Sequence, residues 1–150
     1  SLCDNAFLKV EMVNLEAKLL STVDFKLAVP SILKFLERYS HIAELSKKEH
    51  YFCCFLLETA LLSTNFLEYQ PSTMAAAAVY LSGKIFSRTP EWSDVLKKET
   101  KLDLEGVRPC AKELFVQLFK SEESKLTATK RKYSTSEFYE VSRFKFDWLK

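Results

Sequence analysis

The chain has 150 residues, 47% of them apolar and 13% aromatic, which is typical of one globular domain with a substantial hydrophobic core. Its 22 basic and 20 acidic residues leave a net charge of +2, so no strong attraction to nucleic acid or to a membrane surface is expected. Only two glycines and four prolines occur, and Asn-Gly and Asp-Gly pairs are absent. This shortage of turn residues argues against a sheet-rich fold.

Two helices are expected in the first part of the chain. Residues 7–20 carry apolar side chains on one face at spacings of three and four, which predicts the first helix. After a short link, Pro30 suits the first turn of a second helix. Its buried stripe should consist of Ile32, Phe35, Leu36 and Tyr39. A third helix should begin after Ser46, because Ser46 and Glu49 have the spacing of a capping box.

The stretch from Pro71 to Ser87 contains four consecutive alanines and a single charge, at Lys84. A helix with so little polar surface must be enclosed by other helices, and its small side chains let the neighbouring backbones approach closely. The stretch is too short to cross a bilayer, and Ser82, Gly83 and Lys84 also argue against a membrane span. We therefore expect it to be the central helix of the domain.

Two more helices complete the predicted bundle. A short one should have Thr89 as its cap and Pro90 at its first position, with Trp92, Val95 and Leu96 facing inward. A long one should begin near Leu104 and be kinked at Pro109. The polar segment that follows should end in a short helix near Lys132, and the last residues should form a surface tail. The fold class is thus all-α, a five-helix bundle around Pro71–Ser87 preceded by one extra N-terminal helix.

No residue pattern in the sequence indicates an active site. His41 and His50 lack carboxylate or cysteine partners at metal-binding spacing, so we expect no cofactor and no metal. The basic run Lys130–Lys132 is more consistent with a solvated surface than with a nucleic-acid site. We expect the cysteines to be buried, reduced thiols of an intracellular protein; they are Cys3, Cys53, Cys54 and Cys110. The protein is therefore not expected to be an enzyme.

Several motifs in order resemble one known family. They are "LLSTVDFKLAVPSILKFLERY", "FLEYQPSTMAAAAVYLS" with its Pro-Ser pair before the alanine-rich helix, "LEGVRPCAKEL", and "KYS" at Lys132. With these motifs the chain resembles the C-terminal half of a cyclin, most closely the mitotic A/B type. The likeness implies that residues 1–23 are the last helix of a preceding cyclin box and a linker, 24–132 the C-terminal cyclin box, and 133–150 a tail. Because the sequence starts at "SLCDNAF", we expect it to be part of a longer polypeptide.

The resemblance implies a non-catalytic regulatory subunit that binds a cyclin-dependent protein kinase in the nucleus or cytoplasm and acts in cell division. The family's kinase-facing glutamate corresponds to Glu16, and its apolar kinase contacts correspond to Leu20, Phe25 and Leu27. From the residues alone, these three could equally be core, and Glu16 an exposed helical acid. Most of the first cyclin box is missing, so we expect this chain alone to activate a kinase poorly.

Two other interpretations belong to different functional classes. The same helical box occurs in general transcription factors that bind DNA and polymerase, and such a function should be accompanied by a strong basic stripe. An enzyme would instead require a deep polar pocket with mutually oriented acid and base groups.

Overall fold

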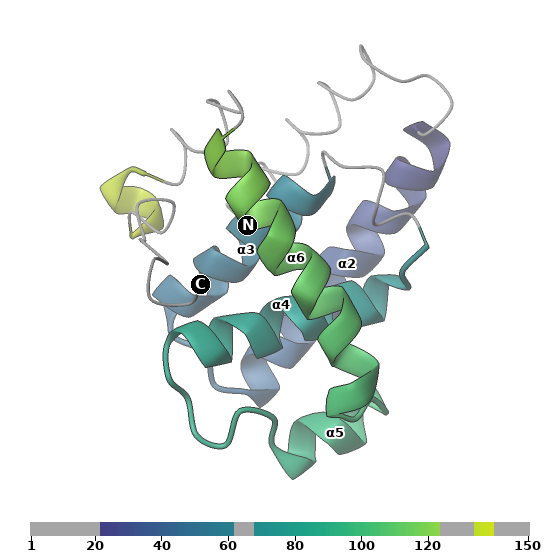
Figure 1. Cartoon of the computed structure of the whole chain (residues 1–150). Helices are drawn as coiled ribbons and strands as arrows, with labels where there is room; N and C mark the ends of the chain where they lie inside the picture. Colours follow the sequence, from purple (N-terminus) through teal and green to yellow (C-terminus); the bar gives the residue numbers. More distant parts are fainter. Residues whose placement is uncertain (1–21, 62–67, 124–133, 140–150) are drawn as a thin grey trace.

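A computed structural model of the chain describes residues 22–61, 68–123 and 134–139. These ranges contain α2 (Thr22–Ile42), α3 (Lys47–Leu61), α4 (Pro71–Ile85), α5 (Asp94–Thr100), α6 (Leu104–Glu123) and the short 3-10 helix η2 (Ser136–Phe138). They contain no strand, which confirms the all-α prediction (Figure 1). The helix predicted at 7–20 and the short one near Lys132 lie outside the described residues.

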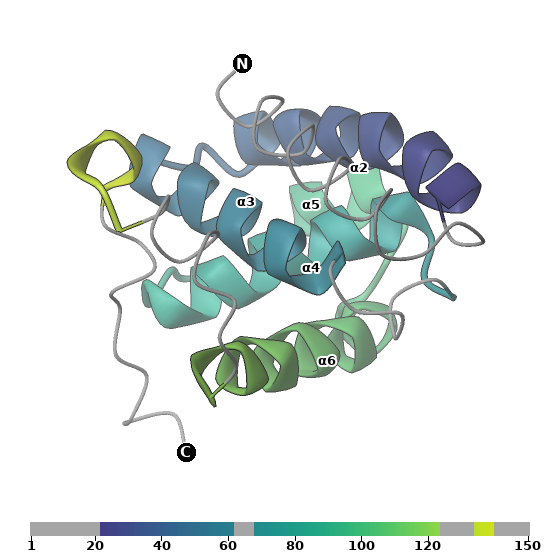
Figure 2. The ribbon, with the colours of Figure 1, turned by 90° about the horizontal axis from the view of Figure 1, so that it is seen from above.

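Helix α4 is the centre of the bundle. It packs against α2, α3, α5 and α6, and α2 and α6 lie on opposite sides of it (Figure 2). The four alanines from Ala75 to Ala78 have no exposed surface, and from Met74 to Ile85 only Lys84 is exposed. Methyl-sized side chains leave room for neighbours on every side of the helix. The alanine run is therefore enclosed, as its composition predicts.

The end of α4 is set by local backbone geometry. Ser87 adopts a left-handed conformation with φ 55°, and the Arg88 N–H donates to the Gly83 carbonyl at 2.8 Å. This bond closes the last turn in the manner of a Schellman motif. The helix consequently stops at Ile85, slightly before the predicted end at Ser87.

Helix α2 begins at Thr22, well before Pro30, so the prediction that Pro30 opens this helix is wrong. Residues 22–29 contain no glycine and no other helix breaker, and an internal proline removes only one amide donor from a helix that already has many. The predicted stripe is largely confirmed: Ile32, Leu36 and Tyr39 are buried, and Phe35 is half-buried.

The start of α3 has the predicted capping box. The Ser46 N–H donates to Oε2 of Glu49 at 2.7 Å, and the Glu49 N–H donates to Oγ of Ser46 at 3.2 Å. These reciprocal bonds satisfy amides that the first turn of a helix leaves without partners. Phe52, Phe55 and Leu56 then enter the core, as their spacing predicts.

The start of α5 differs from the prediction. Its cap is Ser93, whose Oγ accepts the Leu96 N–H at 3.2 Å, whereas Thr89 lies in the preceding turn, in a cis peptide bond with Pro90. Ser93 followed by Asp94 is as good a helix start as Thr89 followed by Pro90, so the sequence favoured neither.

The later start of α5 changes which side chains face the core. Leu96 is buried, but the side chain of Val95 is 57% exposed, so the prediction that it faces inward is wrong. Trp92 precedes the helix and donates its indole N–H to the Leu102 carbonyl at 2.9 Å. Helix α6 contains Pro109, and Val107, Ala111, Leu114 and Leu118 are buried along it. The predicted kink at Pro109 stays a prediction.

Cys53 and Cys110 are buried free thiols, as predicted. Cys54 is disulfide-bonded, so the expectation of reduced thiols is wrong for that residue. The spacing of cysteines along a sequence does not reveal which of them approach each other in space, which is why the sequence did not indicate it.

Within the described ranges, no helix has both the length and the apolar character that crossing a membrane requires.

Candidate protein-binding surfaces

The residues predicted to contact a kinase fall near or beyond the start of the described chain. Glu16 and Leu20 lie outside the described residues. The backbone of Phe25 and Leu27 belongs to the first half of α2, and their side chains lie outside the described part. The described part of the chain therefore does not test whether these four residues form a site, and their role stays a prediction.

A cluster centred on Arg88 joins three segments of the chain. Its guanidinium donates from Nε to Oε1 of Glu49 at 2.6 Å and from Nη2 to Oε2 of Glu49 at 2.8 Å. It also donates from Nη1 to the Ala43 carbonyl and from Nη2 to the Glu44 carbonyl, both at 2.8 Å. The turn after α2, the first turn of α3 and the segment after α4 are thereby tied together.

Both partners of this cluster remain charged. The hydrogen bond from Arg88 holds the pKa of the Glu49 carboxyl below its ordinary value, and the Ser46 amide lowers it further, against the opposing effect of burial. The same hydrogen bond raises the pKa of Arg88. A carboxylate engaged in this way, with its side chain only 10% exposed, has no free proton-transfer role. We interpret the cluster as structural; it was not predicted from the sequence, because Arg88 and Glu49 are far apart in it.

The two histidines do not form a site. Nδ1 of His50 lies 2.9 Å from Oγ of Ser40, and burial lowers the pKa of His50, so its imidazole is neutral near neutral pH. His41 is exposed. In the described part of the chain, no three His, Cys, Asp or Glu side chains are grouped so that they could hold a metal ion.

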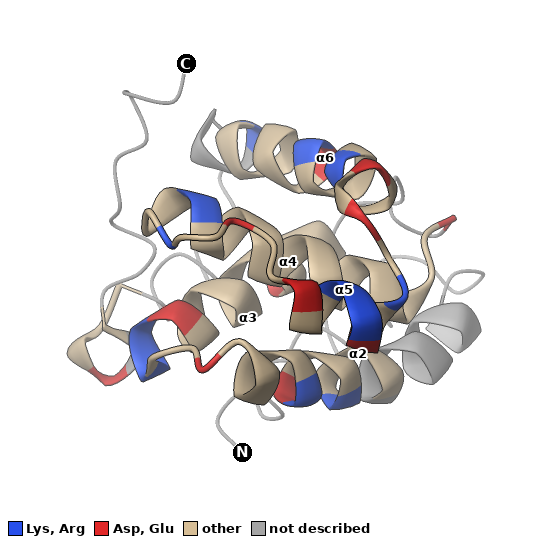
Figure 3. Ribbon diagram, turned by 90° about the horizontal axis from the view of Figure 1, so that it is seen from below, with Lys and Arg blue, Asp and Glu red and all other residues tan. Residues whose placement is uncertain are grey.

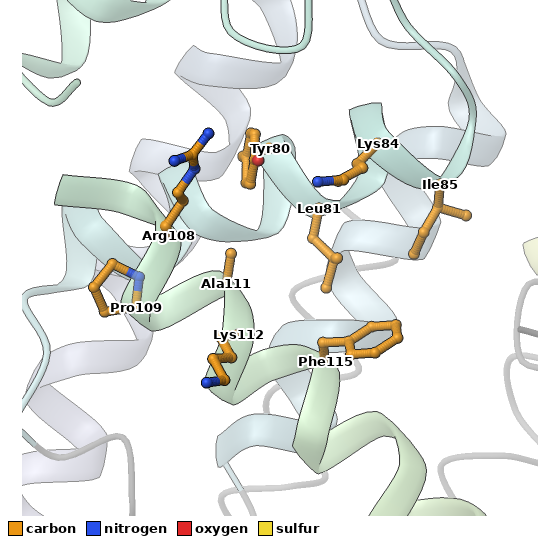
Figure 4. Close-up of a pocket in the computed structure, with 9 residues that line it drawn as sticks. All are labelled: Tyr80, Leu81, Lys84, Ile85, Arg108, Pro109, Ala111, Lys112 and Phe115. Atoms are coloured by element: carbon orange, nitrogen blue, oxygen red, sulfur yellow. The ribbon is translucent and has the colours of Figure 1, made fainter. Parts of the chain in front are cut away.

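A groove with a volume of about 620 Å³ lies between α4 and α6 (Figure 4). It is lined by Tyr80, Leu81, Lys84, Ile85, Arg108, Pro109, Ala111, Lys112 and Phe115. These lining residues include no carboxylate, histidine or cysteine. The groove therefore offers apolar contact and positive charge, which suit binding, and it lacks the paired acid and base groups of an active site. The sequence analysis did not predict this groove. The only signals for it in the sequence are that Lys84 is the one charge in the alanine helix and that Arg108 and Lys112 are four residues apart.

The fold and these surfaces define an all-helical domain built around one enclosed helix. Residues 30–147 match the sequence model of the family described as "Cyclin, C-terminal domain". The chain therefore belongs to the cyclin family, a regulatory and non-catalytic family, and carries its C-terminal cyclin box.

Known relatives place this box with the B type. The "G2/mitotic-specific cyclin-B" of Patella vulgata is 33% identical over 139 residues, which cover 93% of this chain and 34% of that protein. "Cyclin-B2-2" of Oryza sativa subsp. indica is 30% identical over 134 residues, covering 89% of this chain and 32% of that protein. The "G2/mitotic-specific cyclin-B" of Marthasterias glacialis is 31% identical over 139 residues, covering 93% and 36%. The chain thus spans about a third of the length of these relatives.

Proposed function

We propose that this chain is the C-terminal part of a regulatory subunit that binds a cyclin-dependent protein kinase and helps to activate it during cell division, in the nucleus or the cytoplasm. The observation that carries this proposal is the match of residues 30–147 to the C-terminal cyclin domain, together with relatives named as mitotic cyclins. The net charge of +2 weighs against the alternative, a transcription-factor-like domain that binds DNA.

The proposed kinase contact lies at the N-terminal end of the domain. The Glu16 carboxylate would pair with a cation of the kinase, and the apolar side chains of Leu20, Phe25 and Leu27 would anchor the contact. In support, the second half of α2 is packed into the core through Ile32, Leu36 and Tyr39. The first half belongs to the same helix and is therefore anchored to the core through it. A contact built on such an element loses little conformational entropy on binding.

The chain alone should activate a kinase poorly. It spans about a third of the length of its relatives, so most of the surface that such a protein could offer a kinase lies outside it. An interface much smaller than about 1,200 Å² is typical only of weak or transient complexes.

Affinity purification of the complete native protein, followed by identification of the co-purified proteins, tests the main proposal. We expect a protein kinase in a one-to-one complex. Recovery of the protein without a kinase, or a gel shift with duplex DNA that weakens steeply as salt is raised, would contradict it.

The interface itself is tested by the double substitution Phe25→Ala and Leu27→Ala in the complete protein. Removal of two anchor side chains should weaken kinase binding by roughly tenfold or more. The substitution Lys34→Ala, at an exposed position of the same helix, is the matched control and should leave the affinity unchanged. Equal kinase affinities for the unmodified protein, the double variant and the control would show that Phe25 and Leu27 do not contribute to the kinase contact.

A further inference from the structure

The groove between α4 and α6 has an apolar floor. Leu81 and Ile85 come from α4 and Ala111 from α6, and all three are at most 6% exposed, while Phe115 is half-buried beside them. Figure 4 shows Leu81, Ala111 and Phe115 facing the space between the two helices. At about 620 Å³, the hollow has the size of pockets that bind ligands, which is roughly 300–1,000 Å³.

The rim of the groove is positively charged. Lys84 comes from α4, and Arg108 and Lys112 come from α6; all three are exposed. In Figure 4 the heads of Arg108 and Lys84 flank Tyr80, and Figure 3 shows basic residues on both helices. Lys84 Nζ lies 5.9 Å from the centre of the Tyr80 ring.

These three cations differ from two arginines that are paired within the chain. Arg88 and Arg38 each make an ion pair with a glutamate. Within the described residues, no hydrogen bond or ion pair engages the side chain of Lys84, Arg108 or Lys112. Their charge is therefore available to a bound molecule.

We propose that this groove binds a short, acidic, amphipathic peptide segment of a partner protein. Bulky apolar side chains of the peptide would lie on Leu81, Ala111 and Phe115, and its carboxylates would pair with Arg108, Lys112 and Lys84. The charge complementarity is what selects this occupant, because an apolar floor alone would accept many peptides.

The last residues of the chain itself fit the groove less well. Residues 140–150 carry Arg143, Lys145 and Lys150 against Glu140 and Asp147, so this segment has a positive net charge. The proposal is also independent of the kinase contact, since α2 and α6 lie on opposite sides of α4 (Figure 2).

Fluorescence anisotropy with labelled synthetic peptides tests the proposal on the 150-residue chain. The probes combine leucine or phenylalanine with aspartate and glutamate, and three versions differ in the spacing between their apolar residues. In the control peptides, asparagine replaces every aspartate and glutamine replaces every glutamate. We expect at least one acidic probe to bind more tightly than about 1 mM, and its amide version to bind at least roughly tenfold more weakly. Two-dimensional NMR should show shifts at the amides of Leu81, Lys84, Ala111 and Lys112.

Charge reversal identifies the groove as the binding surface. The variant Arg108→Glu with Lys112→Glu should weaken binding by roughly tenfold or more. The variant Lys34→Glu with Lys47→Glu changes the net charge equally, at exposed positions on α2 and α3, and should bind as the unmodified chain does. Circular dichroism confirms that each variant is folded.

Several results would overturn the proposal. They are failure of every acidic probe to bind, equal binding of acidic and amide probes, an equal loss in both charge-reversal variants, or NMR shifts confined to other helices. Binding that appears only after residues 140–150 are deleted would identify the tail as the occupant and would likewise overturn it.

Discussion

Replacement of Arg88 by methionine should strongly destabilise this domain. Methionine keeps much of the apolar stem but removes four hydrogen bonds, two to Glu49 and two to backbone carbonyls. Glu49, whose side chain is 10% exposed, would be left with a charge and without its cation. Breaking a buried pair by removing one partner costs about 3–5 kcal/mol.

The expected loss is smaller than that full value, because the side chain of Arg88 is 35% exposed and water can reach part of the site. We expect the free energy of unfolding to fall by about 2–3 kcal/mol. Urea unfolding followed by circular dichroism measures this loss. The slope of the unfolding free energy against urea concentration should be the same in the variant and the unmodified chain. Arg88→Lys should restore only part of it, since an ammonium cannot make the same forked set of bonds.

The exposed pair of Arg38 and Glu99 provides a matched control. Nη2 of Arg38 lies 2.6 Å from Oε2 of Glu99, but the two side chains are 56% and 35% exposed. Arg38→Met should therefore cost less than about 1 kcal/mol. If Arg88→Met costs no more than Arg38→Met, the reasoning from burial and hydrogen bonding is refuted.

Three further predictions concern the core and its titratable groups. Ala77→Leu should lower the free energy of unfolding by about 1–3 kcal/mol because the enclosed helix has no room for a larger side chain; Lys97→Leu, at an exposed position, should change it by under about 0.5 kcal/mol in the same urea assay. Burial lowers the pKa of His50, so the imidazole takes up a proton more readily in the unfolded chain than in the folded one. The free energy of unfolding should therefore fall as the pH drops below about 6.5. The substitution His50→Gln should make this dependence on pH weaker. Burial raises the pKa of Cys53 and of Cys110 to about 12, so neither thiol should react with a thiol reagent at about pH 8 until the protein unfolds.

Each of these predictions has a contrary result. Equal stability of Ala77→Leu and the unmodified chain would mean that α4 is not tightly enclosed. If the free energy of unfolding depends on pH identically in the unmodified chain and in the His50→Gln variant, burial does not disfavour protonation of the His50 imidazole. Modification of Cys53 at the rate of a free thiol in solution would mean that α3 opens without global unfolding.

The sequence predicted the elements whose signals are local. The alanine run could only belong to an enclosed helix, and the capping box of Ser46 and Glu49 marks the start of α3 without any knowledge of the rest of the chain. Pro30 was misinterpreted because a proline suits the first turn of a helix and is also tolerated inside one, and no residue from 22 to 29 indicates which of the two applies. Val95 was misplaced because two nearby residues, Thr89 and Ser93, were both acceptable caps.

The features that depend on residues far apart in the sequence could not be predicted. Arg88 meets Glu49 and the turn after α2 only when three segments fold together. The groove likewise combines Lys84 with Arg108 and Lys112 from a different helix. The residues proposed to face a kinase came only from the family resemblance, because periodicity alone does not distinguish an apolar interface from core.

We propose that the complete protein of which this domain is a part regulates a protein kinase, and that it does so without catalysing a reaction itself. The most direct test measures phosphate transfer to a protein substrate by the co-purified kinase, alone, with the complete native protein, and with the 150-residue chain. The account predicts strong stimulation by the complete protein, little or none by the 150-residue chain, and no transfer without the kinase. Equal rates with and without the complete protein, or phosphate transfer in the absence of kinase, would contradict it.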